Sequence, residues 1–265
     1  MSKKFVTKLE RRGNITVSGP EARKFLQGLI TNDINRLQDQ PLIYACLLSP
    51  QGKFQYDFFI YNKDEDTFCI DCEGGERAEN LSKKLSMFKL RSDARIECDT
   101  NTEVTVGTAE KPANAYIDPR LEELGWRDYE SSVSSEDPVS LYDSNLLELG
   151  VPNGSKDMVP DKSTVIESWL HKLNAVSFDK GCYMGQELVA RMYYRGLAKK
   201  HLYPVKIKDQ TPIQTGQNIK THDEKLAGEM RSTSGQHGMA LLKDKLFETL
   251  ESEGPVFPYK PDWMK

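Results

Sequence analysis

Short runs of apolar residues bounded by turn residues predict a series of β-strands in the first half of the chain. The expected strands cover residues 14–18, 42–48, 53–61, 67–72, 94–98 and 103–107. The second, third and fourth of these follow one another across tight polar turns, including Ser49-Pro50-Gln51-Gly52, which is typical of an antiparallel meander.

Apolar residues at intervals of three and four predict helices between these strands. One opens after Gly19-Pro20, a second covers 76–90, and a third covers 164–173, where Thr164 and Glu167 match a capping box. Another helical pattern begins at Gln186. Helices mixed with antiparallel hairpins indicate an α+β fold rather than a parallel doubly wound sheet.

The pattern of apolar and turn residues changes after residue 198. Short segments then alternate with turn glycines such as Gly216, Gly228 and Gly235, which predicts a small β-barrel or sandwich. We therefore expect one large region over 1–198 and a smaller antiparallel β-barrel over 199–265.

Composition limits the classes of function and location. A formal net charge of −4 argues against a nucleic-acid partner, and no apolar run approaches the roughly 18 residues of a membrane span. Five irregularly spaced cysteines indicate reduced thiols rather than a disulfide framework. The N-terminus has no apolar stretch typical of a signal peptide, so we expect a cytoplasmic, bacterial protein without a membrane partner.

The segment 178–196 carries the most unusual chemistry. Gly181 and Gly185 bracket Cys182, and a helix is expected to begin just beyond them. The helix N-terminus and the nearby Lys180 would both favour a thiolate at Cys182, which indicates a reactive or ligand-facing thiol. A buried structural cysteine in a tight turn is the alternative, and local chemistry alone favours it.

Other candidates carry weaker signals. Asp57 interrupts an aromatic strand, where its carboxylate would bind a flat heterocycle or face solvent at a sheet edge. Cys69 and Cys72 lie three apart in a strand and therefore point to opposite faces, so we expect no metal site there. The basic stretch 191–201 would meet an anionic group or form a solvated surface.

The octapeptide Lys180-Gly181-Cys182-Tyr183-Met184-Gly185-Gln186-Glu187 resembles the signature of the YgfZ family, whose members share Lys-Gly-Cys-Tyr-x-Gly-Gln-Glu. Weaker likenesses follow in the expected order over most of the chain. They lie at 25–34, 48–53, 118–120, 124–127 and 203–242.

This resemblance implies a fold like that of the glycine-cleavage T-protein, a cloverleaf of two interlocked α+β modules and a C-terminal antiparallel β-barrel around a central opening. It implies tetrahydrofolate, or a one-carbon derivative, as cofactor, and iron–sulfur client or assembly proteins as partners. Separately, a lone motif cysteine cannot complete a closed metal site by itself, so we expect no permanently bound metal. Lys180 and Cys182 carry over as the residues needed for activity. The residues expected near the folate are Asn32, Asp33, Asp57, Tyr183, Gln186, Glu187 and Arg191.

Three functions remain open from the sequence. The first is a folate-dependent accessory protein for assembly or repair of iron–sulfur clusters. The second is an aminomethyltransferase, a transferase that passes a one-carbon unit to tetrahydrofolate, although T-proteins carry two adjacent acidic residues where this chain has Tyr56-Asp57. The third is a non-catalytic folate-sensing scaffold.

Overall fold

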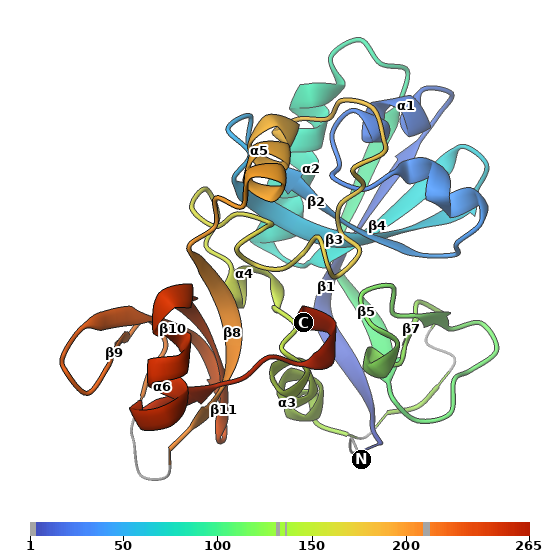
Figure 1. Ribbon diagram of the computed structural model, residues 1–265. Coiled ribbons are helices and arrows are strands. Elements are labelled where there is room, and N and C mark those ends of the chain that lie inside the picture. Colours follow the sequence, from blue (N-terminus) through green and yellow to red (C-terminus); the bar gives the residue numbers. More distant parts are fainter. Residues whose placement is uncertain (1–3, 131–132, 136, 209–212) are drawn as a thin grey trace.

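The computed structural model describes residues 4–130, 133–135, 137–208 and 213–265. Three lobes surround the middle of the molecule, as the expected cloverleaf requires (Figure 1). Two lobes share one large sheet, and the third is a C-terminal sheet of its own. The expected α+β class is confirmed, because every pairing between named strands is antiparallel.

Seven strands of the described chain form the large sheet in the order β2-β3-β4-β1-β5-β7-β6. The expected meander is confirmed as its first three strands. The strand bounds are β1 (Val6–Ser18), β2 (Ile43–Leu48), β3 (Phe54–Asp64), β4 (Thr67–Glu73), β5 (Arg95–Gly107), β6 (Tyr116–Ile117) and β7 (Trp126–Asp128).

The long strands β1 and β5 interlock the first two lobes. One end of β1 pairs with β4, and β5 pairs with β1 over nearly its whole length before its far end pairs with β7. The sequence indicated only the end of β1 and two separate pieces of β5. The extra length escaped notice because polar residues, such as Arg11 and Arg12 in β1, interrupt the apolar alternation where the register shifts.

Helices cover one face of the sheet beside the meander. The helix α1 (Ala22–Gln27) and the helix α2 (Glu76–Lys89) confirm two expectations, and α2 buries Ala78, Leu81 and Leu85. Strand β2 is buried on both faces, because its alternate residues belong to two different hydrophobic clusters. The 3₁₀ segments η1 (Ile34–Gln38) and η2 (Glu122–Leu124) lie in the connections.

The opposite face packs against α3 (Val139–Leu149), which the sequence did not predict, and against an irregular segment at 164–173. The expected helix there is wrong, because Trp169 adopts a left-handed φ of 59° that breaks the helical ladder. The capping contact does form, since the backbone N–H of Glu167 donates to Thr164 Oγ1 at 3.3 Å. Leu170 and Leu173 are buried as the apolar spacing predicts.

The third lobe is a five-stranded sheet in the order β12-β8-β11-β10-β9 of the described chain. Its strands are β8 (Lys200–Ile207), β9 (Asn218–Lys220), β10 (Leu226–Ser234), β11 (His237–Lys243) and β12 (Val256–Pro258). The segments η3 (Asp244–Leu246), α6 (Phe247–Glu253) and η4 (Asp262–Met264) complete it. A separate apolar cluster, which includes Val205, Met230 and Leu242, forms its core.

Candidate functional site

The octapeptide leads into the helix α5 (Gln186–Arg195), as its sequence predicts. Gly185 caps this helix with a φ of 82°, and a Cβ at this position would lie 2.6 Å from the carbonyl oxygen of Ser49. The second glycine is therefore required for close approach to the turn before β3. Gly181 has no such constraint, since nothing lies within 4 Å of its would-be Cβ.

Lys180 ties the octapeptide to the loop that follows α1. Its side chain is buried, and Nζ donates hydrogen bonds to the carbonyl oxygens of Gln27 at 2.7 Å, Ile30 at 2.8 Å and Asn32 at 2.7 Å. Burial lowers the pKa of Lys180 to about 8, while the charge of Asp33 acts in the opposite direction. The ammonium group thus uses all three of its protons on backbone acceptors. We call these contacts the Lys180 clamp.

Replacing Lys180 with Met should release the clamp. Three carbonyl groups lose their donor, and each unsatisfied buried acceptor costs roughly 1–3 kcal/mol, so we expect the free energy of unfolding to fall by at least about 3 kcal/mol. Urea unfolding measures this loss, and limited proteolysis locates any loosening at 178–184. Lys24→Met, an exposed change of the same type on the neighbouring α1, should stay within about 0.5 kcal/mol of wild type. Equal stability of the two variants would contradict the clamp.

Two of the predicted folate residues belong to this clamped loop. The side chain of Asn32 is buried and donates from Nδ2 to the carbonyl oxygens of Tyr44 and Asn174, both at 2.8 Å. Asp33 caps η1, since its Oδ1 accepts the backbone N–H of Asn35 at 2.9 Å. Both residues therefore shape the backbone that Lys180 holds.

Cys182 and its neighbour Tyr183 face opposite environments. Cys182 is an exposed free thiol, whereas Tyr183 is buried in the core with its ring centroid 5.1 Å from Lys180 Nζ. Burial raises the pKa of Tyr183, and the nearby Cys46 adds to this effect. The alternative of a buried structural cysteine at 182 is wrong, because the Cys182 side chain is exposed. The buried residues of the octapeptide are Lys180 and Tyr183, on either side of it.

The remaining octapeptide residues lie on α5. Glu187 and Arg191 are exposed on one side of the helix and line a shallow depression with Tyr194 and Arg195. Gln186 is half-buried at the first turn. No ion pair joins Glu187 to Arg191 within the part of the chain that the structure describes.

Asp57 lies apart from the octapeptide, in a cavity of about 530 Å³ between the large sheet, α3 and the short helix α4 (Gly154–Asp157). We call it the Asp57 cavity. Strand alternation places Asp57 on the same face as Phe59, as predicted, and the hydroxyl of Tyr44 donates to Asp57 Oδ2 at 2.7 Å. Burial raises the pKa of Asp57, and the charge of Glu73 adds to the increase.

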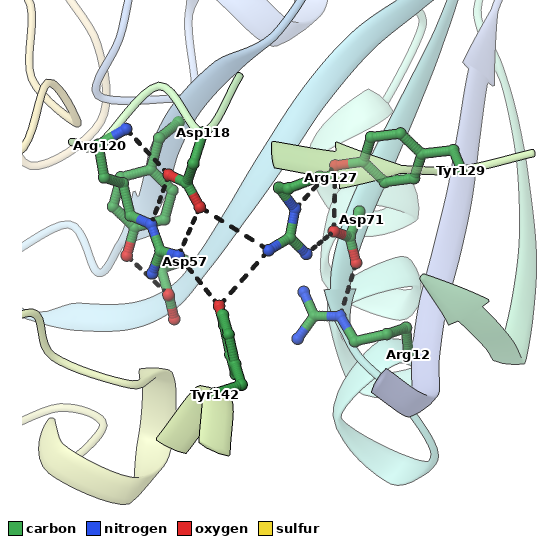
Figure 2. Close-up of polar contacts among 9 residues, drawn as sticks. Arg12, Asp57, Asp71, Asp118, Arg120, Arg127, Tyr129 and Tyr142 are labelled. Atoms are coloured by element: carbon green, nitrogen blue, oxygen red, sulfur yellow. Dashed lines mark hydrogen bonds and ion pairs between the residues drawn. The ribbon is translucent and has the colours of Figure 1, made fainter. Parts of the chain in front are cut away.

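A network of buried charges forms one wall of the Asp57 cavity (Figure 2). Arg127 donates to Asp71 Oδ2 at 2.6 Å, and Arg12 donates to Asp71 Oδ1 at 2.7 Å. Burial alone would raise the pKa of Asp71, but the two guanidinium groups outweigh it and hold that pKa below its usual value.

The same network continues to a second ion pair, between Arg120 and Asp118. Arg120 makes a two-pronged contact with Asp118, at 2.9 and 2.7 Å. The hydroxyl of Tyr142 accepts from Arg120 at 3.0 Å and from Arg127 at 3.5 Å, so α3 is joined to both. The guanidinium carbon of Arg127 also lies 3.9 Å from the centroid of the Phe59 ring.

Basic side chains outnumber acidic ones around this cavity. The basic lining residues are Arg11, Arg12, Arg77, Arg120, Arg127 and Lys156, and the acidic ones are Glu10, Asp57, Glu73 and Asp143. With the aromatic rings of Phe59 and Tyr142, this set fits a flat heterocycle that carries an acidic tail.

The structure thus divides the predicted residues into three places. Lys180, Asn32 and Asp33 meet at the clamp, Asp57 lines a cavity of its own, and Glu187 and Arg191 lie on the exposed side of α5. Tyr44 joins the first two places, since its backbone accepts from Asn32 and its hydroxyl donates to Asp57. Sequence reasoning missed this link, and it missed the cavity arginines as well. The only signal for the arginines was Asp118-Pro119-Arg120 and Trp126-Arg127 among the weaker family likenesses.

The described residues contain no group of three or more His, Cys, Asp and Glu side chains that could hold a metal ion. Cys69 and Cys72 are both buried, and Cys72 packs with the cluster beneath α2. No helix in the described ranges is long and apolar enough to cross a bilayer.

Comparison with known proteins agrees with this architecture. Residues 6–106 match the GCVT N-terminal domain, and residues 199–265 match the C-terminal β-barrel domain of CAF17. The aminomethyltransferase T of the glycine cleavage system from Bartonella henselae superimposes with a TM-score of 0.73 at 15% identity, over 91% of this chain and 79% of that one. The fold is therefore that of the glycine-cleavage T-protein with a CAF17-type barrel.

Two relatives place the chain more narrowly. The mitochondrial iron–sulfur cluster assembly factor IBA57 of Mus musculus is 30% identical to this chain, in an alignment that covers 97% of this chain and 84% of the relative. Its counterpart in Homo sapiens is 31% identical, in an alignment that covers 89% of this chain and 76% of that relative. The chain belongs to the YgfZ/CAF17 family that includes these IBA57 proteins, and the resemblance seen in the octapeptide is confirmed.

The expected bacterial cytoplasmic location is wrong. The relatives from mouse, human and Neurospora crassa are mitochondrial proteins of eukaryotes. That expectation rested on an N-terminus without an apolar stretch and on the cysteine content, and neither feature distinguishes one reducing aqueous compartment from another.

Proposed function

We propose that this protein binds tetrahydrofolate and supports the assembly or repair of iron–sulfur clusters in client proteins, with Cys182 as the key thiol. The observation that carries the proposal is the exposed Cys182 thiol, held in place by the Lys180 clamp on one side and the Gly185 contact on the other. The names of the IBA57 relatives, which are iron–sulfur cluster assembly factors, supply the process.

The thiol suits this role because its neighbours fix the backbone while the sulfur stays accessible. An exposed thiolate is a soft ligand for iron and a good nucleophile. A single cysteine leaves the other positions around iron to a partner, so a cluster shared with the partner is the chemistry that this geometry supports.

The folate part of the proposal rests on the Asp57 cavity. Asp57 Oδ2 accepts from Tyr44, and Oδ1 has no hydrogen-bond partner among the described residues, so it is free to accept from a ligand. Arg11, which has no ion-pair partner among the described residues, lines the same cavity, and its guanidinium group suits a carboxylate of a folate tail. Arg77 and Lys156 also line it, and each already pairs with a protein carboxylate, Glu73 and Asp143 respectively. When bound, tetrahydrofolate would supply a one-carbon carrier, and this chain would orient it and shield it from water.

Calorimetric titration with tetrahydrofolate tests the cofactor. We expect micromolar binding to wild type, about 8 kcal/mol of free energy, and a loss of roughly 10-fold or more in Asp57→Ala, because a charged hydrogen bond contributes about 1.5–3 kcal/mol. Cys182→Ala should bind as wild type does, since Cys182 does not line the cavity. Absence of binding to wild type would remove folate from the proposal, and equal loss in both variants would place the thiol at the ligand.

A further inference from the structure

A second cavity lies on the other side of Tyr44. Its volume is about 460 Å³, within the usual range for small-molecule sites. It lies among η1, the start of β2 and the segment around β6, and we call it the Asn32 cavity. It shares no lining residue with the Asp57 cavity. The lining residues are Asn32, Arg36, Gln40, Pro41, Leu42, Ile43, Tyr44, Lys111, Ala115, Tyr116, Ile117, Pro119 and Asn174.

The charge of this lining has one sign. Arg36 and Lys111 are basic, and none of the described lining residues is acidic. Lys111 Nζ donates to the carbonyl oxygens of Pro112 at 2.9 Å and Ala115 at 2.8 Å, so its position is fixed while its charge stays uncompensated. The guanidinium group of Arg36 has no hydrogen-bond or ion-pair partner within the ranges that the structure describes. The chain as a whole has a net charge of −4, so two cations without an acidic partner give this cavity a local positive charge opposite to that of the whole chain.

The rest of the wall is apolar or amide. Ile117 is 47% exposed, and Tyr116 packs partly buried against the edge of the core, with its ring tilted 6.0 Å from Tyr61 and 5.9 Å from Tyr129. Asn32 and Asn174 stand at the opposite side, joined by the hydrogen bond from Asn32. A ligand with a flat or aliphatic body would cover the exposed apolar surface.

We propose that the Asn32 cavity binds a small organic carboxylate, whose carboxylate lies between Arg36 and Lys111 and whose body packs on Tyr116 and Ile117. Arginine matches a carboxylate in two hydrogen bonds, and the remaining proton of Lys111 is free for a third. The site is separate from the Asp57 cavity. It abuts the Lys180 clamp, because Asn32 contributes to both.

Nuclear magnetic resonance titration of the full chain tests the site with benzoate as probe and benzamide as its neutral counterpart. We expect benzoate to bind with a Kd of about 1 mM and benzamide at least about 10-fold more weakly. Arg36→Gln should abolish the preference for benzoate and leave benzamide binding unchanged. Arg91→Gln, which removes an equal charge from an exposed position elsewhere, should leave both unchanged.

Three results would overturn the proposal: no benzoate binding up to about 10 mM, equal affinity for the two probes, or benzoate binding that Arg36→Gln leaves intact. Displacement of benzoate by tetrahydrofolate would likewise count against a separate carboxylate site. Tetrahydrofolate titration of Arg36→Gln should match wild type. A failure of the carboxylate site is therefore distinguishable from a failure of the folate proposal.

Discussion

Cells that carry Cys182→Ser in place of the wild-type protein are expected to lose its contribution to iron–sulfur enzymes. A serine hydroxyl keeps the size and exposure of the side chain, but at neutral pH it is neither a thiolate nor a soft ligand for iron. The measurement is the activity and cluster content of iron–sulfur enzymes in a host whose own copy of the gene is deleted. We expect values equal to those of the deletion strain.

Cys98→Ser is the matched control. Cys98 is the other exposed free cysteine in the described chain, and it lies on β5 away from the octapeptide. This variant should restore cluster content fully. If Cys182→Ser also restores it, the thiol has no part in the function, and the protein acts as a folate-dependent scaffold. Folding is checked in the same experiment, because both serine variants should accumulate to wild-type levels.

Replacing Arg127 with Met is expected to lower the free energy of unfolding by about 3–5 kcal/mol, the usual cost of removing one partner from a buried ion pair. The side chain is 1% exposed and carries contacts with Asp71, Tyr129 and Tyr142. Its loss leaves the buried Asp71 carboxylate with a single guanidinium partner, Arg12.

The pH dependence of this loss follows from Asp71. Its pKa is lowered in the folded protein, so it stabilises the fold above its unfolded pKa of about 3.9, and this contribution disappears as pH falls through the folded value. The difference between wild type and Arg127→Met should therefore be largest near neutral pH and narrow below about pH 4. Urea unfolding over this pH range measures it.

Arg95→Met provides the comparison for Arg127. Arg95 pairs with Glu97 at 2.6 Å, but the two side chains are 78% and 57% exposed, so water screens the pair. Such pairs contribute about 0–1 kcal/mol. A loss in Arg127→Met no larger than that in Arg95→Met would show that the buried network does not stabilise the fold.

Local patterns predicted the parts of the fold whose apolar residues repeat without interruption. The meander, α1, α2 and α5 are such parts, and each matches its expected place. The helix expected at 164–173 shows the limit of this reasoning. Its apolar spacing is real and buries Leu170, but Trp169 donates from Nε1 to the carbonyl oxygen of Leu202 in the C-terminal sheet. That contact accompanies the left-handed backbone of Trp169, which the apolar spacing does not predict.

For the site, the sequence by itself determined the octapeptide that marks the family, the helix just beyond it and the need for glycine near that helix start, while the chemistry of its thiol stays a prediction. Those features depend on residue type and spacing within a few positions. Only the tertiary structure decided that Lys180 holds backbone carbonyls about 150 residues away in the chain. It alone brought Arg12 of β1, Arg127 of β7 and Arg120, from the connection between β6 and η2, to one cavity wall. Burial and pairing of charges depend on which distant segments meet, and the spacing of residues within one segment does not predict those contacts.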